Sequence, residues 1–259
     1  KKSKTRLGKS PAPATVLRYL MALSHAFNVA RKQWNWCESS PVENVQRPKV
    51  KNERTRYLTD AEREALLHAC KNSTNADLYL VVLLAISTGM RKGEIMGMRW
   101  QDIHTAPDQS FTRVHLTKTK NDKARSVLIT SPALEMLEER RAKLIESRQI
   151  KAATGLIFPS ATNADQPVDL RKPWGFALQT AGIEEFRLHD LRHTTASYLA
   201  MDGASLLSIS KVLGHQTTKM TERYSHLATS HIDEVVRSMN AKKFGPASKS
   251  APTTETNES

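Results

Sequence analysis

Nine consecutive apolar residues, Leu78 to Ile86, constrain the fold more than any other segment of this chain. A surface helix or a half-exposed strand alternates apolar and polar positions, so an unbroken run is typical of an element that is buried on all sides. Thr88-Gly89 follows, and glycine often ends a helix. We therefore predict a buried helix that ends at Gly89. The run is too short to span a bilayer.

Other segments indicate a mainly helical protein with a small sheet. Thr59-Asp60-Ala61-Glu62 is a capping box, in which the threonine hydroxyl and the glutamate carboxylate satisfy free N–H groups at a helix start. Two β-prone runs, 111–117 and 126–129, are joined by the charged segment 118–123, which predicts an antiparallel hairpin. Further helices are expected near residues 132–146, 174–180, 190–201, 205–213 and 232–239. The predicted fold class is α+β, mainly α with a small antiparallel β-sheet.

The N-terminal region differs from the rest in its charge. Residues 1–56 contain 13 Lys and Arg but only 3 Asp and Glu, and thus hold most of the formal net charge of +13. From Ala14 onward, apolar residues recur at helical spacing, and one such helix cannot bury its own apolar stripe. We expect its helical partners upstream, in a larger protein. The predicted organisation is a partial helical domain at 1–50, a linker at 51–56, a second domain at 57–240 and a disordered tail at 241–259.

Charge and cysteine content limit the function classes. An excess of positive charge indicates a polyanionic partner, most often nucleic acid, although a basic arm that only aids solubility has the same composition. Cys37 and Cys70 are the two cysteines, which excludes a disulfide scaffold and a cysteine-based zinc site. The basic start has no apolar core close behind it and so does not resemble a signal peptide. We expect a cytoplasmic protein without a membrane span.

Several residues have side chains suited to phosphate chemistry. His189 and Arg192 are three residues apart at a predicted helix start and therefore share a face, where both could bind one phosphate. Two other interpretations remain open: a capped helix start with an exposed arginine, or a metal site formed by His189, Asp190 and His193. Arg91 follows the glycine turn after the buried helix, where it is either held rigidly or part of a charged rim. Glu94 could orient it or continue an exposed face.

Two further residues lie near the C-terminus. His215 follows Gly214, which is expected to end the helix 205–213, so the histidine is either a site residue or an ordinary surface residue. Tyr224 lies in a polar stretch, where a lone tyrosine is usually exposed and without function. As a nucleophile it is weak at its ordinary pKa of about 10 and needs neighbouring cations and a base.

Taken together and in order, these motifs resemble the tyrosine recombinases of the phage integrase family. The resemblance covers about residues 14 to 240. Its motifs are Thr88-Gly89-Met90-Arg91-Lys92-Gly93-Glu94-Ile95, His189-Asp190-Leu191-Arg192-His193, Leu213-Gly214-His215 and Tyr224-Ser225-His226. The family hairpin commonly reads Lys-x-x-Lys-x-Arg, which Lys120-Asn121-Asp122-Lys123-Ala124-Arg125 fits without a gap. Leu128 stands where the family often has proline, a departure that should not affect the chemistry.

The resemblance implies a role for each matched residue. Arg91 and Arg192 would clamp the scissile phosphate, His189 would contact it and could transfer a proton, and His215 would donate a hydrogen bond to it. Tyr224 would attack the phosphorus and form a 3′-phosphotyrosyl link with release of a 5′-hydroxyl. A hairpin lysine would protonate the leaving oxygen. Lys120 is favoured, although Lys118 is two residues earlier and would face the same way in a strand.

The resemblance also implies an assembly. The activity would be site-specific recombination of double-stranded DNA, with no cofactor, metal or ATP, because the covalent intermediate conserves the phosphodiester energy. The family pattern implies a partial core-binding domain and a catalytic domain that form a C-shaped clamp on DNA and act as a homotetramer. The helix from His231 to Met239 would dock on a neighbouring protomer or pack on its own domain. Accessory DNA-bending or directionality proteins are possible further partners.

Two other function classes remain. A DNA-binding repressor would use residues 205–223 as a helix–turn–helix, but this interpretation leaves Arg91, His189, Arg192 and Tyr224 unexplained together. A metal phosphohydrolase would use His189, Asp190 and His193, for which the sequence offers no convincing further ligands.

Overall fold

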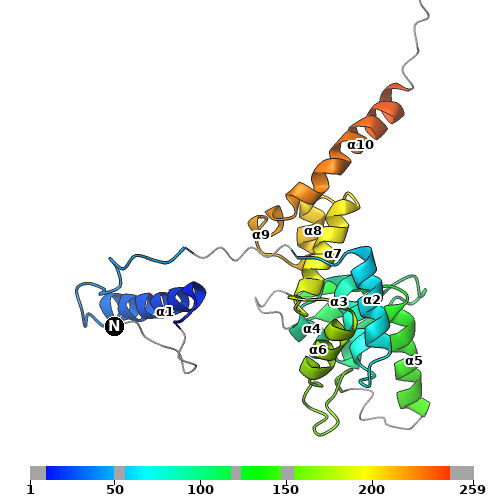
Figure 1. Cartoon of the computed structure of the whole chain (residues 1–259), viewed down its shortest axis with the longest axis horizontal. Helices are drawn as coiled ribbons and strands as arrows, with labels where there is room; N and C mark the ends of the chain where they lie inside the picture. The colour runs from blue at the N-terminus through cyan, green and yellow to red at the C-terminus, as the bar shows by residue number, and fades with distance from the viewer. Residues whose placement is uncertain (1–9, 50–55, 118–123, 147–154, 246–259) are drawn as a thin grey trace, which may run out of the picture. The chain divides into compact units, whose positions relative to one another are not determined.

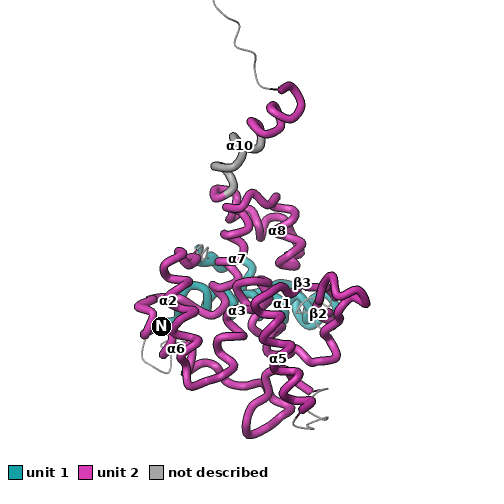
Figure 2. Tube along the Cα trace, turned by 90° about the vertical axis from the view of Figure 1, so that its right-hand side faces the viewer, with its two compact units in different colours: residues 1–54 teal, residues 55–259 magenta. Residues whose placement is uncertain are grey.

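The chain forms two compact units, residues 1–54 and residues 55–259 (Figure 2). This computed structural model describes residues 10–49, 56–117, 124–146 and 155–245, with the backbone alone for residues 228–235. Lys118 and Lys120 therefore lie outside the described residues, as does most of the predicted linker.

The first unit contains one helix, α1 (Pro13–Lys32), among its described residues (Figure 1). The prediction of a helix from Ala14 onward is confirmed. Proline at the first helical position suits the start, because its missing N–H has no helical partner there. None of the residues in α1 is buried, and Tyr19, Met21 and Leu23 on it are largely exposed.

The second unit begins with α2 (Asp60–Lys71), and its predicted capping box is present. Glu62 donates its backbone N–H to the Thr59 hydroxyl at 3.3 Å, and the Glu62 carboxylate accepts from the Thr59 backbone N–H at 2.8 Å. Each bond satisfies a donor that the helix itself leaves free. The carboxylate also accepts from Arg56 at 3.0 Å, which fixes the entry of the chain into this unit.

The predicted buried helix is α3 (Leu78–Thr88), and it lies at the centre of the second unit (Figure 1). It packs against α2, α5 (Ala133–Glu146), α7 (Asp190–Met201) and the strand β3 (Arg125–Ile129). Gly89 ends it in the left-handed region at φ 64°. A Cβ atom on Gly89 would lie 2.5 Å from Leu213 Cδ2, so glycine is required for both its conformation and its size.

The sheet is small and antiparallel, as predicted, with strand order β1-β2-β3. The predicted hairpin consists of β2 (Thr112–Leu116) and β3, with Val114 opposite Val127. Alternate residues of β2 are buried, in agreement with the two-residue period of a strand. A third strand, β1 (Ile103–Thr105), was not predicted, because three residues are too few to show a period. It follows a short helical turn, η1 (Trp100–Asp102).

Helices dominate the remainder of the second unit. These are α4 (Lys92–Met96), α6 (Arg171–Thr180), α8 (Leu206–Leu213), α9 (Lys219–Glu222) and α10 (Ser225–Phe244). The helices predicted near 132–146, 174–180, 190–201 and 205–213 are confirmed, and so is the fold class. Among the described helices, none is long and apolar enough to cross a bilayer.

The last helix is longer than predicted. α10 starts at Ser225 rather than Ile232 and ends at Phe244 rather than Met239, so residues 241–244, which were assigned to the tail, are helical. No glycine or proline interrupts the sequence between Gly214 and Gly245, and Gly245 at φ 72° follows the last turn. The start of α10 packs against α7, whereas Val236, Met239 and Phe244 in its second half are exposed.

Candidate active site

Five of the six predicted catalytic residues line one pocket. Its volume is about 240 Å³, and its lining is strongly basic; it consists of Arg91, His189, Arg192, His193, His215, Met220, Arg223 and Tyr224. These residues come from the α3–α4 turn, the start of α7 and the segment from the end of α8 to the start of α10. The sixth residue, Lys120, and its alternative Lys118 lie outside the described residues.

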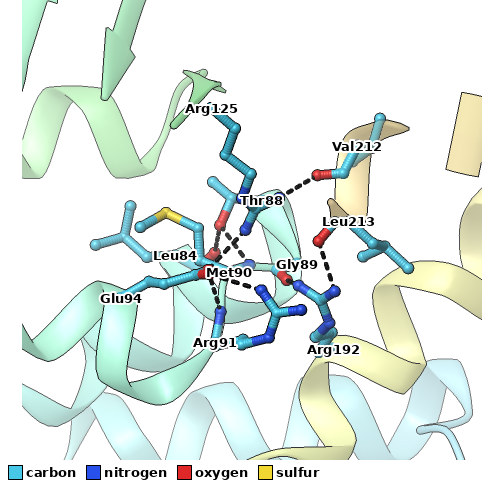
Figure 3. A network of polar contacts seen from close by, with 10 residues as sticks. All are labelled: Leu84, Thr88, Gly89, Met90, Arg91, Glu94, Arg125, Arg192, Val212 and Leu213. Carbon is cyan, nitrogen blue, oxygen red and sulfur yellow. Dashed lines mark hydrogen bonds and ion pairs between the residues drawn. The ribbon is translucent and has the colours of Figure 1, made fainter. Parts of the chain in front are cut away.

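Arg192 is held by the ends of two other helices. Its guanidinium donates to the backbone carbonyls of Gly89 at 2.7 Å and Leu213 at 2.5 Å (Figure 3). The residue is only 4% exposed. Burial, followed by the charges of Arg91 and Arg125, lowers the pKa of Arg192 to about 9. A buried cation beside other cations is stabilised when an anion binds next to it.

Arg91 is oriented by Glu94, one turn further along. The Glu94 carboxylate accepts from the Arg91 backbone N–H and from its guanidinium, both at 2.8 Å, and from Arg125 at 2.6 Å (Figure 3). Burial alone would raise the pKa of Glu94, but these bonds from Arg91 and Arg125 hold it below its ordinary value. The alternative that Glu94 continues an exposed face is therefore wrong, since Glu94 is 9% exposed.

Arg125 was not predicted as part of the site. From the start of β3 it donates to Glu94 and also to the Val212 carbonyl near the end of α8 at 2.5 Å. It thereby connects the hairpin, the Arg91 turn and the segment that leads to His215 (Figure 3). The sequence signal was its position in the Lys-x-x-Lys-x-Arg pattern, which gave no indication of its partners.

His215 follows the helix end that the sequence predicted. Gly214 adopts φ 65°, and a Cβ atom there would lie 2.8 Å from Arg125 Cδ. Nδ1 of His215 lies 2.9 Å from the Thr221 hydroxyl, which fixes the ring. Burial, and then the charges of Arg192 and Arg91, lower the pKa of His215 to about 4, so the ring is neutral at pH 7.

His189 is the residue before α7, is exposed at the pocket and lies beside His193. The two rings meet edge to face, with centroids 5.5 Å apart. Burial, and then the charge of Arg192, lower the pKa of His189. A neutral imidazole can donate from one nitrogen and accept at the other, which suits both hydrogen bonding to a phosphate and proton transfer.

Tyr224 is buried, although its polar sequence surroundings suggested exposure. The residue is 1% exposed and packs in a small apolar cluster with Ile209 and Leu213 of α8 and Ala196 and Ala200 of α7. Burial raises the pKa of Tyr224, and the charges of Arg223 and Arg192 oppose part of that rise. The neighbouring cations that a tyrosine nucleophile needs are therefore present.

The Tyr224 hydroxyl lies 2.5 Å from Nδ1 of His193. The sequence offered His193 only as a possible metal ligand with His189 and Asp190. Within the described ranges, no three His, Cys, Asp or Glu side chains are grouped as metal ligands. The contact with Tyr224 gives His193 a different role, for which the sequence held no signal.

A larger hollow lies elsewhere on the second unit. It has a volume of about 1030 Å³ and is formed by the end of α2, its following turn and α6, with Phe176 and Thr180 in its lining. None of the predicted catalytic residues is among those that line it, and Arg171 there is paired with Asp169 at 2.7 Å. The small basic pocket is therefore the candidate active site.

Comparison with known proteins shows the family to which the chain is similar. Residues 56–231 match the model of the phage integrase family. The shufflon-specific DNA recombinase of Escherichia coli is 33% identical over 223 residues, which cover 86% of this chain and 53% of that protein. The catalytic domain of bacteriophage HP1 integrase is 29% identical, with a TM-score of 0.52, over 75% of this chain and 98% of that domain.

A DNA-bound relative shares the fold. The site-specific recombinase XerH, solved in a post-cleavage complex with a palindromic difH substrate, has a TM-score of 0.68 and 22% identity over 87% of this chain and 67% of XerH. The chain belongs to the phage integrase family of tyrosine recombinases. It spans about half the length of the shufflon-specific recombinase.

Proposed function

We propose that this chain is the catalytic part of a site-specific DNA recombinase that cleaves and rejoins strands through a 3′-phosphotyrosyl intermediate. The observation that carries the proposal is one basic pocket shared by Tyr224, Arg91, Arg192 and His215. Family membership and the DNA-bound structure of XerH support it.

Each residue has a step in this proposal. Arg91 and Arg192 bind the two non-bridging oxygens of the scissile phosphate, and His189 and His215 donate hydrogen bonds to it. The Tyr224 oxygen attacks phosphorus and gives its proton to the free nitrogen of the neutral His189 ring, and the bond to the 5′-oxygen breaks. Lys120, favoured over Lys118, gives that oxygen its proton. Attack by a 5′-hydroxyl from another strand reverses these steps and releases Tyr224.

Electrostatics explains why such a pocket would accelerate the reaction. Negative charge on the phosphate oxygens increases as phosphorus becomes five-coordinate, and donors held in place beforehand stabilise the transition state more than the ground state. One such donor is typically worth about 3–4 kcal/mol. Because the phosphotyrosyl bond conserves the energy of the phosphodiester, the cycle as proposed uses neither metal nor ATP.

The proposed partners are double-stranded DNA and further copies of this chain. The basic residues of the 1–50 segment would bind backbone phosphates, with a strong dependence on salt. A homotetramer on DNA is proposed because the second half of α10 exposes Val236, Met239 and Phe244, which suits docking on a neighbouring protomer. Accessory DNA-bending or directionality proteins belong to the same proposal. Cytoplasmic action is proposed because DNA is the substrate and Cys37 and Cys70 are free thiols.

A nicked suicide duplex tests the proposal. It should carry the DNA that flanks the reading frame, so that cleavage releases a short strand and traps the covalent product. We expect a protein–DNA adduct that resists chelator and is absent with Tyr224→Phe. An adduct that persists in Tyr224→Phe would exclude Tyr224 as the nucleophile. Chelator-sensitive hydrolysis would favour the metal enzyme, and tight binding without cleavage would favour the repressor.

A further inference from the structure

We propose that His193 is a positioning residue for the nucleophile, because its Nδ1 holds the Tyr224 hydroxyl inside the pocket. The inference rests on the proposed function, in which Tyr224 attacks the phosphate. It adds a residue to the site for which the family pattern assigned no role.

The His193 ring is fixed by its two neighbours. His189 contacts it edge to face, with centroids 5.5 Å apart, and the Tyr224 ring is tilted by 41° to it, with centroids 6.1 Å apart. The short contact between Nδ1 and the hydroxyl, at 2.5 Å, joins α7 to the start of α10. A buried phenol without a hydrogen-bond partner is costly, so this contact also stabilises the burial of Tyr224.

The surroundings of His193 determine whether its ring is charged. Asp190 and Arg192 on its own helix, Arg223 and Tyr224 from the α9–α10 segment, and His189 and His215 surround it. Burial, and then His189, lower the pKa of His193 to about 4. The ring is thus neutral at pH 7. In the tautomer that carries its proton on Nε2 it accepts at Nδ1, and in this proposal Tyr224 then donates its O–H and keeps its oxygen lone pairs available for phosphorus.

Helix geometry relates this contact to the phosphate clamp. Arg192 and His193 are adjacent on α7, so their side chains leave the helix about 100° apart. Arg192 reaches the carbonyls of Gly89 and Leu213, and His193 reaches Tyr224. One helical turn therefore places both the cation that binds the phosphate and the residue that holds the nucleophile.

The test is single-turnover cleavage of the nicked duplex by His193→Ala and His193→Asn. Asparagine places an amide group near the position of Nδ1 and can accept a hydrogen bond, but it is not a base at neutral pH. We expect His193→Ala to reduce the cleavage rate by about tenfold or more, the equivalent of one hydrogen bond in the transition state. His193→Asn should recover most of the rate. DNA affinity should change less than twofold in both, and His104→Ala, on the exposed face of the sheet, is the matched control.

A second substrate separates positioning from leaving-group chemistry. This substrate is a duplex in which sulfur replaces the bridging 5′-oxygen of the scissile phosphate. The sulfur leaves as a thiolate and needs no proton from the protein. On the sulfur substrate, the cleavage rate of His193→Ala should remain low, whereas the cleavage rate of Lys120→Ala should return towards that of wild type. If His193→Ala does not fold, the test rests on His193→Asn, which retains the hydrogen bond and should cleave at close to the wild-type rate.

Three results would overturn the inference: wild-type rates in His193→Ala, equal loss in the Asn and Ala variants, or recovery of His193→Ala on the sulfur substrate. An adduct formed by the wild-type chain in those experiments would leave the proposed function intact. Absence of any adduct with the wild-type chain would instead overturn the proposed function, and the inference with it.

Discussion

Arg125 at the start of β3 donates to Oε2 of Glu94 on α4 at a distance of 2.6 Å. Both side chains are largely buried, with 13% and 5% of their surfaces exposed. Because Glu94 also binds Arg91, this ion pair transmits the position of the hairpin to a residue of the candidate phosphate clamp. Stability and activity should therefore both depend on a carboxylate that makes no contact with the substrate in the proposed mechanism.

Substitution of Glu94 tests that dependence. Glu94→Ala leaves Arg91 and Arg125 without their shared partner, and the loss of one member of a buried ion pair typically costs about 3–5 kcal/mol. Glu94→Gln keeps one carbonyl oxygen as an acceptor and should lose less. Denaturant unfolding and single-turnover cleavage should both decline in the order wild type, Gln, Ala. Glu139→Gln is the control, because its contact with Lys143 is 3.9 Å long and exposed. Equal stability of Glu94→Ala and Glu139→Gln would contradict this prediction.

Gly214 should tolerate no side chain. Alanine there combines positive φ with a Cβ atom 2.8 Å from Arg125 Cδ, so we expect a loss of about 1–2 kcal/mol and a displaced His215. Gly182→Ala is a matched control: its φ is 66°, but nothing lies within 4 Å of the added Cβ. Both variants should lose stability in thermal melts, but only Gly214→Ala should also lose cleavage activity. Normal cleavage by Gly214→Ala would show that His215 does not depend on this turn.

Inorganic phosphate should stabilise the protein through the basic pocket. The low pKa of Arg192, about 9, reflects its burial and its repulsion from Arg91 and Arg125, which an anion would relieve. A ligand at 100 times its Kd stabilises the fold by about 2.7 kcal/mol, or several degrees in Tm. The rise in Tm with phosphate should exceed the rise in Tm with chloride at equal ionic strength. It should be smaller in Arg91→Ala than in wild type. The control is Arg171→Ala, whose guanidinium is exposed beside Asp169. An identical increase in Arg91→Ala would place the anion elsewhere.

Acid should destabilise the fold before its carboxylates are protonated. His193 and His215 have a pKa of about 4 in the folded protein, and burial also lowers that of His189. In the unfolded chain a histidine titrates near 6.5, so between pH 7 and pH 5 the unfolded state takes up more protons and becomes favoured. We expect a loss of roughly 2–4 kcal/mol over this range, after allowance for the partial exposure of the rings.

This loss of stability can be measured as the change in Tm between pH 7 and pH 5. His215→Asn should show a shallower decline than wild type, because it removes one group that titrates differently in the two states. His104→Asn, on the exposed face of the sheet, should follow the wild-type curve. A constant Tm between pH 7 and pH 5 would mean that these histidines take up protons in the folded protein as they do in the unfolded chain.

Features that depend on neighbouring residues could be predicted from the sequence. The Thr59–Glu62 capping box, the buried helix α3 and the hairpin each have their determinants within a short segment. The contacts that shape the site, in contrast, join residues that are far apart in the sequence. Arg125 and Glu94 are 31 residues apart, and so are His193 and Tyr224, so no periodicity relates them. The burial of Tyr224 depends on a small core between α7 and α8, whereas its own surroundings in the sequence are polar.

The order of the motifs indicated which residues belong together, but not how they contact each other. Arg91, His189, Arg192, His215 and Tyr224 were grouped through a resemblance, and the pocket places them together. The choice of Lys120 over Lys118 stays a prediction. The length of α10 was underestimated because the polar residues that follow Tyr224 gave no clear helical stripe, and only Gly245 marks its end.

The burial of Tyr224 has a consequence for selectivity. With 1% of its surface exposed, the phenol is shielded from small reagents that label surface tyrosines. In the proposed mechanism, an electrophile reaches it only through a narrow basic pocket, after the arginines have bound its charge. The same packing that stabilises the helices around Tyr224 would thus restrict a reactive group to the one substrate that fits, and would protect other DNA from accidental breakage.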